Sequence, residues 1–166
     1  MMFVRDLMTR DVEACGPAST LAEAALMMWR RDCGFLPVVD ADQGVVGVIT
    51  DRDLCMAIAT ERRDTRSICV EDVMTRSPVM CRPHDSLHVA ISTMAVSHVR
   101  RLPVTNELGK LHGVLSLDDL AVATQEGSRP ERGPSRAEVM GVLQAVALPR
   151  SLRRAVHAAA GQYPFP

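Results

Sequence analysis

The chain has 166 residues and a formal net charge of -1 at pH 7, with 47% hydrophobic residues, 23% charged residues and five cysteines. This charge gives no long-range field strong enough to gather nucleic acid, which argues against nucleic-acid binding. Without a C-x-x-C pair or an apolar run of about 18 residues, the sequence predicts no zinc knuckle, disulfide framework or membrane span. We therefore expect a cytoplasmic globular protein with reduced, buried thiols that binds neither nucleic acid nor membrane.

The sequence contains an internal repeat with an offset of 66 residues. Residues 4–54 align without a gap with residues 70–120, and 17 of the 51 aligned pairs are identical. The repeated motifs are Met8-Thr9-Arg10 with Met74-Thr75-Arg76, Leu36-Pro37-Val38 with Leu102-Pro103-Val104, and Gly47-Val48 with Gly113-Val114. Agreement of this kind at one fixed period indicates that a single structural unit is duplicated.

Each copy has the same order of predicted elements, which is β-α-β-β-α. Thr20 and Ser86 fit as N-caps of the first helix, and Pro17 and Pro83 separate that helix from the strand before it. In the first copy the predicted elements are a strand at 12–15, a helix at 20–32, two strands at 36–39 and 45–50, and a helix that opens at Asp51. In the second copy they are a strand at 79–81, a helix at 86–98, two strands at 102–105 and 111–116, and a helix that opens at Leu117.

One such unit leaves an apolar sheet face uncovered, so we expect the two copies to pack sheet against sheet with pseudo-two-fold symmetry. The predicted fold class is α+β, built from two α/β-like repeats and a short C-terminal helical tail. The predicted organisation is a first repeat at 1–60, a linker at 61–69, a second repeat at 70–124, a flexible linker at 125–134 and the tail at 135–166.

The tail is predicted to open with a capping box formed by Ser135 and Glu138. Val139, Val142, Leu143 and Val146 then fall on one stripe of a helix. A short helix of this kind is stable only when its apolar stripe is packed on something. The sequence leaves open whether that surface belongs to its own domain or to a partner subunit.

The last strand of each copy ends in the pattern Gly-h-h-[Thr/Ser]-x-x-Asp, where h is apolar. The polar pair is Thr50 and Asp53 in the first copy and Ser116 and Asp119 in the second. In one interpretation the pair is a capping box that only satisfies backbone N–H groups at a helix start. In the other, the helix start and the hydroxyl bind a phosphate, while the carboxylate accepts hydrogen bonds from two ribose hydroxyls.

With these motifs in both copies, the chain resembles a tandem pair of cystathionine-β-synthase-type (CBS) domains, known as a Bateman module. The resemblance covers residues 4–123. It implies a regulatory module that binds AMP, ADP, ATP or S-adenosylmethionine, pairs into a flat, disc-like homodimer, and controls an attached or associated protein. The capping-box interpretation favours the alternative, a structural dimerisation or interaction module without a ligand.

The resemblance implies two clefts, each built from both copies. In one cleft Asp119 would hold the ribose and Ser116 the phosphate, and in the other Asp53 and Thr50 would do so. The residues that would lie against the base are Thr9, Val12, Cys33 and Gly34 in the first cleft and Thr75, Pro78, Val99 and Arg100 in the second.

Arg100 and Arg101 stand where such proteins place a basic residue that binds phosphate, whereas the first copy has Gly34 and Phe35 at these positions. A charged hydrogen bond contributes about 1.5–3 kcal/mol, so we expect the two clefts to differ in affinity.

No catalytic set of nucleophile and base is evident, so we expect no enzyme activity and no cofactor. The histidines His84 and His88 have the spacing of a metal pair. Because no third ligand is evident, a solvated surface pair is the preferred interpretation and no metal site is predicted.

Overall fold

The computed structural model describes residues 1–124 and 133–148. The predictions for residues 125–132, within the flexible linker, and for residues 149–166, at the end of the tail, lie outside the described residues. In the two described ranges, no helix is long and apolar enough to cross a membrane.

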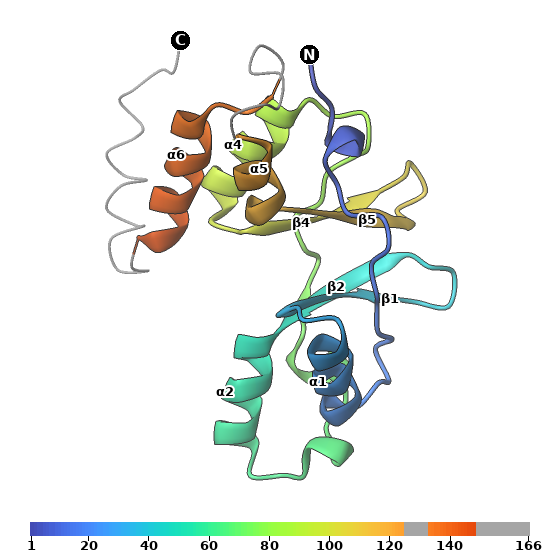
Figure 1. Ribbon diagram of the computed structural model, residues 1–166. Helices are drawn as coiled ribbons and strands as arrows, with labels where there is room; N and C mark the ends of the chain where they lie inside the picture. The colour runs from blue at the N-terminus through green and yellow to red at the C-terminus, as the bar shows by residue number, and fades with distance from the viewer. Residues whose placement is uncertain (125–132, 149–166) are drawn as a thin grey trace.

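Two antiparallel β-hairpins face each other in the middle of the molecule, and helices cover their outer faces (Figure 1). The paired strands are β1 (Phe35–Val39) with β2 (Val45–Thr50), and β4 (Arg101–Thr105) with β5 (Leu111–Ser116). The covering helices are α1 (Leu21–Arg30) and α2 (Asp51–Glu61) on the first hairpin, and α4 (Leu87–Ser97) and α5 (Leu117–Ala123) on the second. The predicted sheet-to-sheet packing of two α/β-like repeats is confirmed.

The two hairpins are also joined at their turns. The Val45 N–H donates to the Gly109 carbonyl at 3.1 Å, and the Leu111 N–H donates to the Gln43 carbonyl at 3.0 Å. Gly109 has a φ of 75°, which an L side chain rarely adopts, so the glycine suits this turn. These bonds fix the position of one sheet relative to the other.

The first predicted strand of each repeat is reduced to a single residue. Cys15 forms one parallel bridge to Val38, and Cys81 forms the equivalent bridge to Val104. A proline follows two residues after each bridge. Because proline lacks the N–H that would continue the pairing, the chain leaves the sheet there and enters the first helix of the repeat.

The N-terminal segment packs on the second repeat before the chain enters the first (Figure 1). It contains η1 (Val4–Asp6), a single 3₁₀ turn whose Val4 N–H donates to the Asp85 carbonyl at 3.0 Å. Val4 is fully buried in the core of the second repeat. Thr9 then exchanges two backbone hydrogen bonds of 2.9 Å with Val114 on β5.

The segment between the repeats makes the reciprocal crossing onto the first repeat. After η2 (Thr65–Ser67), Ile68 is buried in the core of the first repeat. The chain continues through α3 (Val70–Val73) to β3 (Thr75–Arg76), which pairs with β2. Each sheet is therefore completed by the segment that precedes the other repeat in the sequence.

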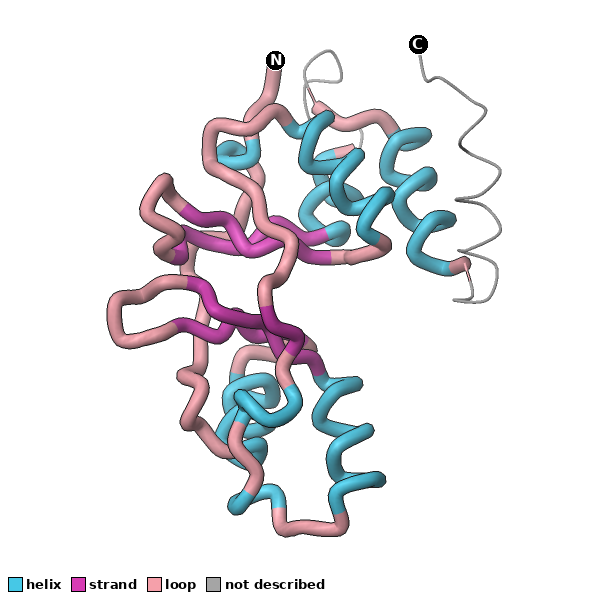
Figure 2. Tube along the Cα trace, turned by 180° about the vertical axis from the view of Figure 1, so that it is seen from behind, coloured by secondary structure: helices cyan, strands magenta, loops and turns pink. Residues whose placement is uncertain are grey.

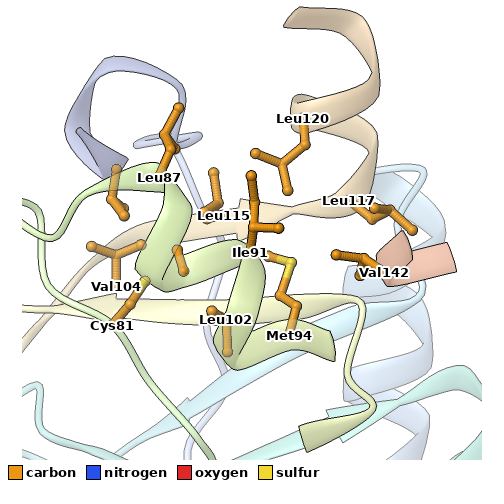
Figure 3. Packing of buried hydrophobic residues seen from close by; sticks show 12 residues of the cluster. Cys81, Leu87, Ile91, Met94, Leu102, Val104, Leu115, Leu117, Leu120 and Val142 are labelled. Carbon is orange, nitrogen blue, oxygen red and sulfur yellow. The ribbon is translucent and has the colours of Figure 1, made fainter. Parts of the chain in front are cut away.

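Each repeat has its own hydrophobic core between its sheet and its helices. In the second repeat, Leu102 and Val104 point from β4 toward Leu120 on α5 and Met94 on α4 (Figure 3). Leu36 and Val38 occupy the equivalent places in the first repeat. Because side chains alternate along a strand, Pro103 and Pro37, which lie between the two core residues of each strand, face the opposite sheet.

The tail helix α6 (Arg136–Ala147) packs on α4 and α5 of its own chain (Figure 2). Ser135 and Glu138 form the predicted capping box at its start, with distances of 2.8, 2.7 and 3.2 Å. Val142 is 1% exposed and belongs to the core of the second repeat. Of the two surfaces that the sequence left open, the helix therefore uses its own domain.

All five cysteines are free thiols, but they differ in exposure. Cys15 and Cys81 are buried as expected, whereas Cys55 on α2 is exposed, which corrects the expectation of uniformly buried thiols. Burial raises the pKa of Cys15 to about 11 and that of Cys81 to about 12. Near neutral pH these two thiols therefore stay protonated and are poor nucleophiles.

We expect N-ethylmaleimide to label Cys55 in the native protein near neutral pH and to leave Cys15 and Cys81 unlabelled until the protein is unfolded. Peptide mass spectrometry after quenching identifies the labelled residues. Rapid native labelling of Cys15 or Cys81 would contradict the burial that raises their pKa values.

Candidate functional site

The hydroxyl and carboxylate pair predicted at the end of each repeat forms a capping box. The Ser116 N–H and Oγ–H donate to Asp119 Oδ2 at 2.8 and 2.6 Å, and the Asp119 N–H donates to Ser116 Oγ at 3.1 Å. Thr50 and Asp53 form the same bonds at 2.9, 2.7 and 3.3 Å. Both boxes use Oδ2 of the aspartate, so Oδ1 lies outside them.

The exchanged N-terminal segment brings Thr9 to Asp119. Thr9 Oγ1 lies 3.5 Å from Asp119 Oδ1, which is long for a hydrogen bond between a hydroxyl and a carboxylate. The contact depends on the pairing of Thr9 with Val114 on β5. Gly113 makes this pairing possible, because a Cβ at that position would overlap the Thr9 carbonyl oxygen.

A cleft of about 230 Å³ opens beside Asp119, with walls from both repeats. The sequence-predicted residues that line it are Thr9, Val12, Cys33, Arg101, Ser116 and Asp119. Residues 101, 116 and 119 come from the second repeat and the others from the N-terminal segment and the first repeat. The cleft is therefore a product of the sheet-to-sheet packing.

Arg101 lies in this same cleft, at the start of β4. Its guanidinium carbon is 5.9 Å from the centroid of the Phe35 ring, at the distance of a cation–π contact. Its Nη2 is 3.9 Å from Asp118 Oδ2, and Asp118 is 86% exposed. Arg101 is thus held over an aromatic ring and has only a long, solvated ion pair.

A second arginine lines the cleft but is already paired. Arg31 Nη1 donates to Asp11 Oδ2 at 3.1 Å, and Arg31 Nε donates to Glu13 Oε2 at 3.2 Å. These two carboxylates raise the pKa of Arg31, so its charge is retained. All three residues are partly or well exposed, so solvent screens the pairs and they add little stability.

Gly34, predicted for the Asp119 cleft, does not line it. Gly34 lines an outer groove between α1 and α2, where a Cβ would meet the Asp51 carboxylate. Arg100 is exposed, and its carbonyl accepts a hydrogen bond of 2.8 Å from the Leu117 N–H.

For the other cleft, the structure places Thr75 beside the strand that ends at Thr50. Thr75 lies on β3 and pairs with Val48, two residues before Thr50 on β2. This is the counterpart of the pairing of Thr9 with Val114. Pro78 follows β3 and is partly buried, and Val99 packs on the core of the second repeat.

Sequence reasoning did not select several residues that line the Asp119 cleft, namely Asp11, Glu13, Arg31, Phe35 and Val114. One available signal was the alignment of Phe35 with Arg101, because equivalent residues that lie near a pseudo-two-fold axis come close to each other. The position of Arg31 had no such signal, because a charge at the end of a helix is usually solvated.

The structure does not bring the two predicted surface histidines together on a metal. His84 Nδ1 lies 2.6 Å from Arg5 Nη1, and His88 Nδ1 lies 3.2 Å from Glu138 Oε1. Among the residues that the structure describes, no three histidine, cysteine, aspartate or glutamate side chains gather as a metal site would require.

Two sheet-to-sheet repeats, exchanged entry segments and an aspartate beside a cleft built from both halves define a tandem-repeat module with a cleft between its halves. The CBS domain profile matches residues 4–60 and 70–126. The chain belongs to the CBS domain family. It is 37% identical over 131 residues to the uncharacterized protein YlbB of Bacillus subtilis, an alignment that covers 78% of this chain and 86% of YlbB.

Solved CBS proteins have the same fold. CBSX2 of Arabidopsis thaliana, solved in complex with AMP, is 29% identical with a TM-score of 0.67, over 74% of this chain and 96% of that one. The CBS-domain protein ATU1752 of Agrobacterium tumefaciens is 32% identical with a TM-score of 0.66, over 74% and 98% of the two chains.

Proposed function

We propose that this CBS pair is a regulatory module that binds an adenosine-containing ligand in the Asp119 cleft and passes its state to a partner protein. The observation that carries the proposal is the position of Asp119, which lines a cleft between the repeats with one carboxylate oxygen outside its capping box. The AMP complex of CBSX2, a similar chain, supports an adenosine ligand.

In the proposed complex, Asp119 Oδ1 accepts hydrogen bonds from the ribose hydroxyls in place of its 3.5 Å contact with Thr9. Ser116 and Arg101 bind the phosphate, and the apolar sides of Val12 and Cys33 face the base. Because the cleft uses both repeats, binding favours one relative packing of the two, which is how a partner would sense the ligand. The Asp53 box is proposed as the weaker site.

The charges of the cleft favour a ligand with few phosphates. Arg31 is neutralised by Asp11 and Glu13, which leaves Arg101 as the less neutralised of the two arginines that line the cleft. Asp118 lies beside Arg101 and repels further anionic groups. We therefore propose AMP or S-adenosylmethionine as the ligand, in preference to ADP and ATP.

We expect a thermal-shift titration to separate these ligands. AMP at 100 times its dissociation constant should stabilise the fold by about 2.7 kcal/mol. ATP at equal concentration should give a smaller shift, because its extra phosphates meet the carboxylates of the cleft. Tighter binding of ATP than of AMP would contradict the charge argument but leave an adenosine ligand in place.

A structural interaction module without a ligand is the second candidate. It is favoured by the capping boxes, because both aspartates already have a role at the start of a helix. A panel of AMP, ADP, ATP and S-adenosylmethionine that produced neither a thermal shift nor heat in calorimetry would support this candidate over the sensor.

A further inference from the structure

The charged and polar side chains of the Asp119 cleft fall into two groups. One group comes from the second repeat, and the proposed complex already uses it to bind the ribose and the phosphate. The other group comes from the N-terminal segment and the end of the first helix of the first repeat, and it consists of Asp11, Glu13 and Arg31. The proposed complex gives this second group no hydrogen bond to the ligand.

The second group lies beside the apolar residues that face the base in the proposed complex. Asp11 and Glu13 flank Val12, and Arg31 precedes Cys33 by two residues. All five residues line the same cleft. A purine presents apolar faces to such a surface, whereas its hydrogen-bonding groups lie along its edge. Polar side chains next to Val12 and Cys33 are therefore placed to bind the edge of the base.

The ion pairs within this group leave an acceptor for a ligand. Arg31 Nε donates to Glu13 Oε2 at 3.2 Å, and Arg31 Nη1 donates to Asp11 Oδ2 at 3.1 Å. Glu13 Oε1 takes part in neither bond. The guanidinium thus holds the Glu13 carboxylate by one oxygen and leaves the other able to accept, as the capping box does for Asp119.

Exposure distinguishes the two carboxylates of the group. The Glu13 side chain is 32% exposed, whereas the Asp11 side chain is 87% exposed. A hydrogen bond to a carboxylate is stronger where less water surrounds it, and a well-exposed carboxylate gains little from a new partner. Glu13 is therefore the carboxylate of this group that can select a ligand.

We propose that Glu13 Oε1 accepts a hydrogen bond from the 6-amino group of the purine base, and that Arg31 is the positioning residue that holds the carboxylate toward it. An ionised carboxylate accepts hydrogen bonds and has none to donate, so it favours a base that carries an amino group there. This inference rests on the proposed function, because it requires the ligand to lie in the Asp119 cleft. It adds the residue that selects the base.

The test compares AMP with purine riboside 5′-monophosphate, which lacks only the 6-amino group, by isothermal titration calorimetry on the full chain. Wild type should bind AMP about 10-fold more tightly, the lower end of the range for a hydrogen bond to a charged group, because Glu13 is partly exposed. Glu13→Ala should bind the two ligands equally, since the acceptor is gone. Comparing ratios in this way cancels general effects of the substitution on affinity.

Asp11→Ala is the matched control, because Asp11 pairs with the same arginine but is well exposed, and it should keep the wild-type preference for AMP. Arg31→Ala should lower the preference, because the Glu13 carboxylate loses the group that orients it. Arg31→Lys should retain more of the preference, because an ammonium group can still pair with Glu13. All four variants should melt close to wild type, since these pairs are screened by solvent.

The outcomes distinguish failure of this inference from failure of the proposed function. Equal binding of the two ligands by wild type, or a preference that survives in Glu13→Ala, would overturn the role of Glu13 and leave an adenosine ligand in place. An equal loss of preference in Asp11→Ala would assign the effect to charge and would also overturn that role, and a full preference in Arg31→Ala would overturn the positioning role of Arg31. Wild type that bound neither ligand would refute the proposed function and this inference with it.

Discussion

Asp119→Asn should weaken binding of the adenosine ligand by on the order of 100-fold, because a neutral amide replaces the charged acceptor for two ribose hydroxyls. The amide oxygen can still accept the Ser116 N–H, which now donates to Asp119 Oδ2 at 2.8 Å, so the start of α5 should persist. Isothermal titration calorimetry with AMP measures the loss.

Asp53→Asn is the matched control, since it alters the same capping box in the other repeat. The two variants should lose similar amounts of folding stability, on the order of 1 kcal/mol or less. Only Asp119→Asn should lose the tighter binding site. Equal loss of that site in both variants would mean that the effect comes through folding, and it would refute the role given to Asp119.

Gly113→Ala should destabilise the fold and weaken the same cleft. The new Cβ overlaps the carbonyl oxygen of Thr9, which is backbone and cannot move aside without breaking its 2.9 Å bond from the Val114 N–H. Overpacking of this kind costs about 1–3 kcal/mol, or roughly 2–12 °C in melting temperature. Affinity for AMP should also fall, because Thr9 lines the cleft.

Gly47→Ala offers the comparison, because Gly47 is the equivalent residue at the crossing of β2 and β3. There the nearest atom to a new Cβ is the Met74 Sδ at 2.5 Å, and the backbone oxygen of Thr75 is at 3.0 Å. A methionine side chain can change rotamer, so the cost should be smaller. Melting curves that ranked the two variants in the opposite order would contradict the different packing of the two crossings.

Much of the fold was predictable because its signals are local. Thr20, Ser86 and Ser135 are N-caps as expected, since a hydroxyl at the first turn satisfies backbone donors wherever the helix later packs. The hairpins followed from their apolar strands and polar turns. The first strand of each repeat is shorter in the structure than predicted. Its length depends on the nearby proline and on how much of the sheet edge is left to pair.

The candidate site was predictable only in part. Ser116 and Asp119 were visible as a motif, and Thr9, Val12 and Cys33 followed from the family resemblance and line the same cleft. Gly34 was also assigned to the Asp119 cleft by that resemblance, and the structure places it in the outer groove between α1 and α2. Successive residues of an extended segment face opposite sides, so a residue next to one that lines the cleft can face away from it.

The duplication, the caps and the aspartates at the starts of α2 and α5 were thus determined by the sequence alone, through spacing and local hydrogen bonding. Only the tertiary structure decided that each sheet is completed by the segment before the other repeat, and that Arg101 lies over Phe35 in the Asp119 cleft. It also decided that α6 covers the second repeat, whereas no helix of the described residues covers the groove between α1 and α2. These outcomes depend on contacts between residues far apart in the chain, which side-chain periodicity does not encode.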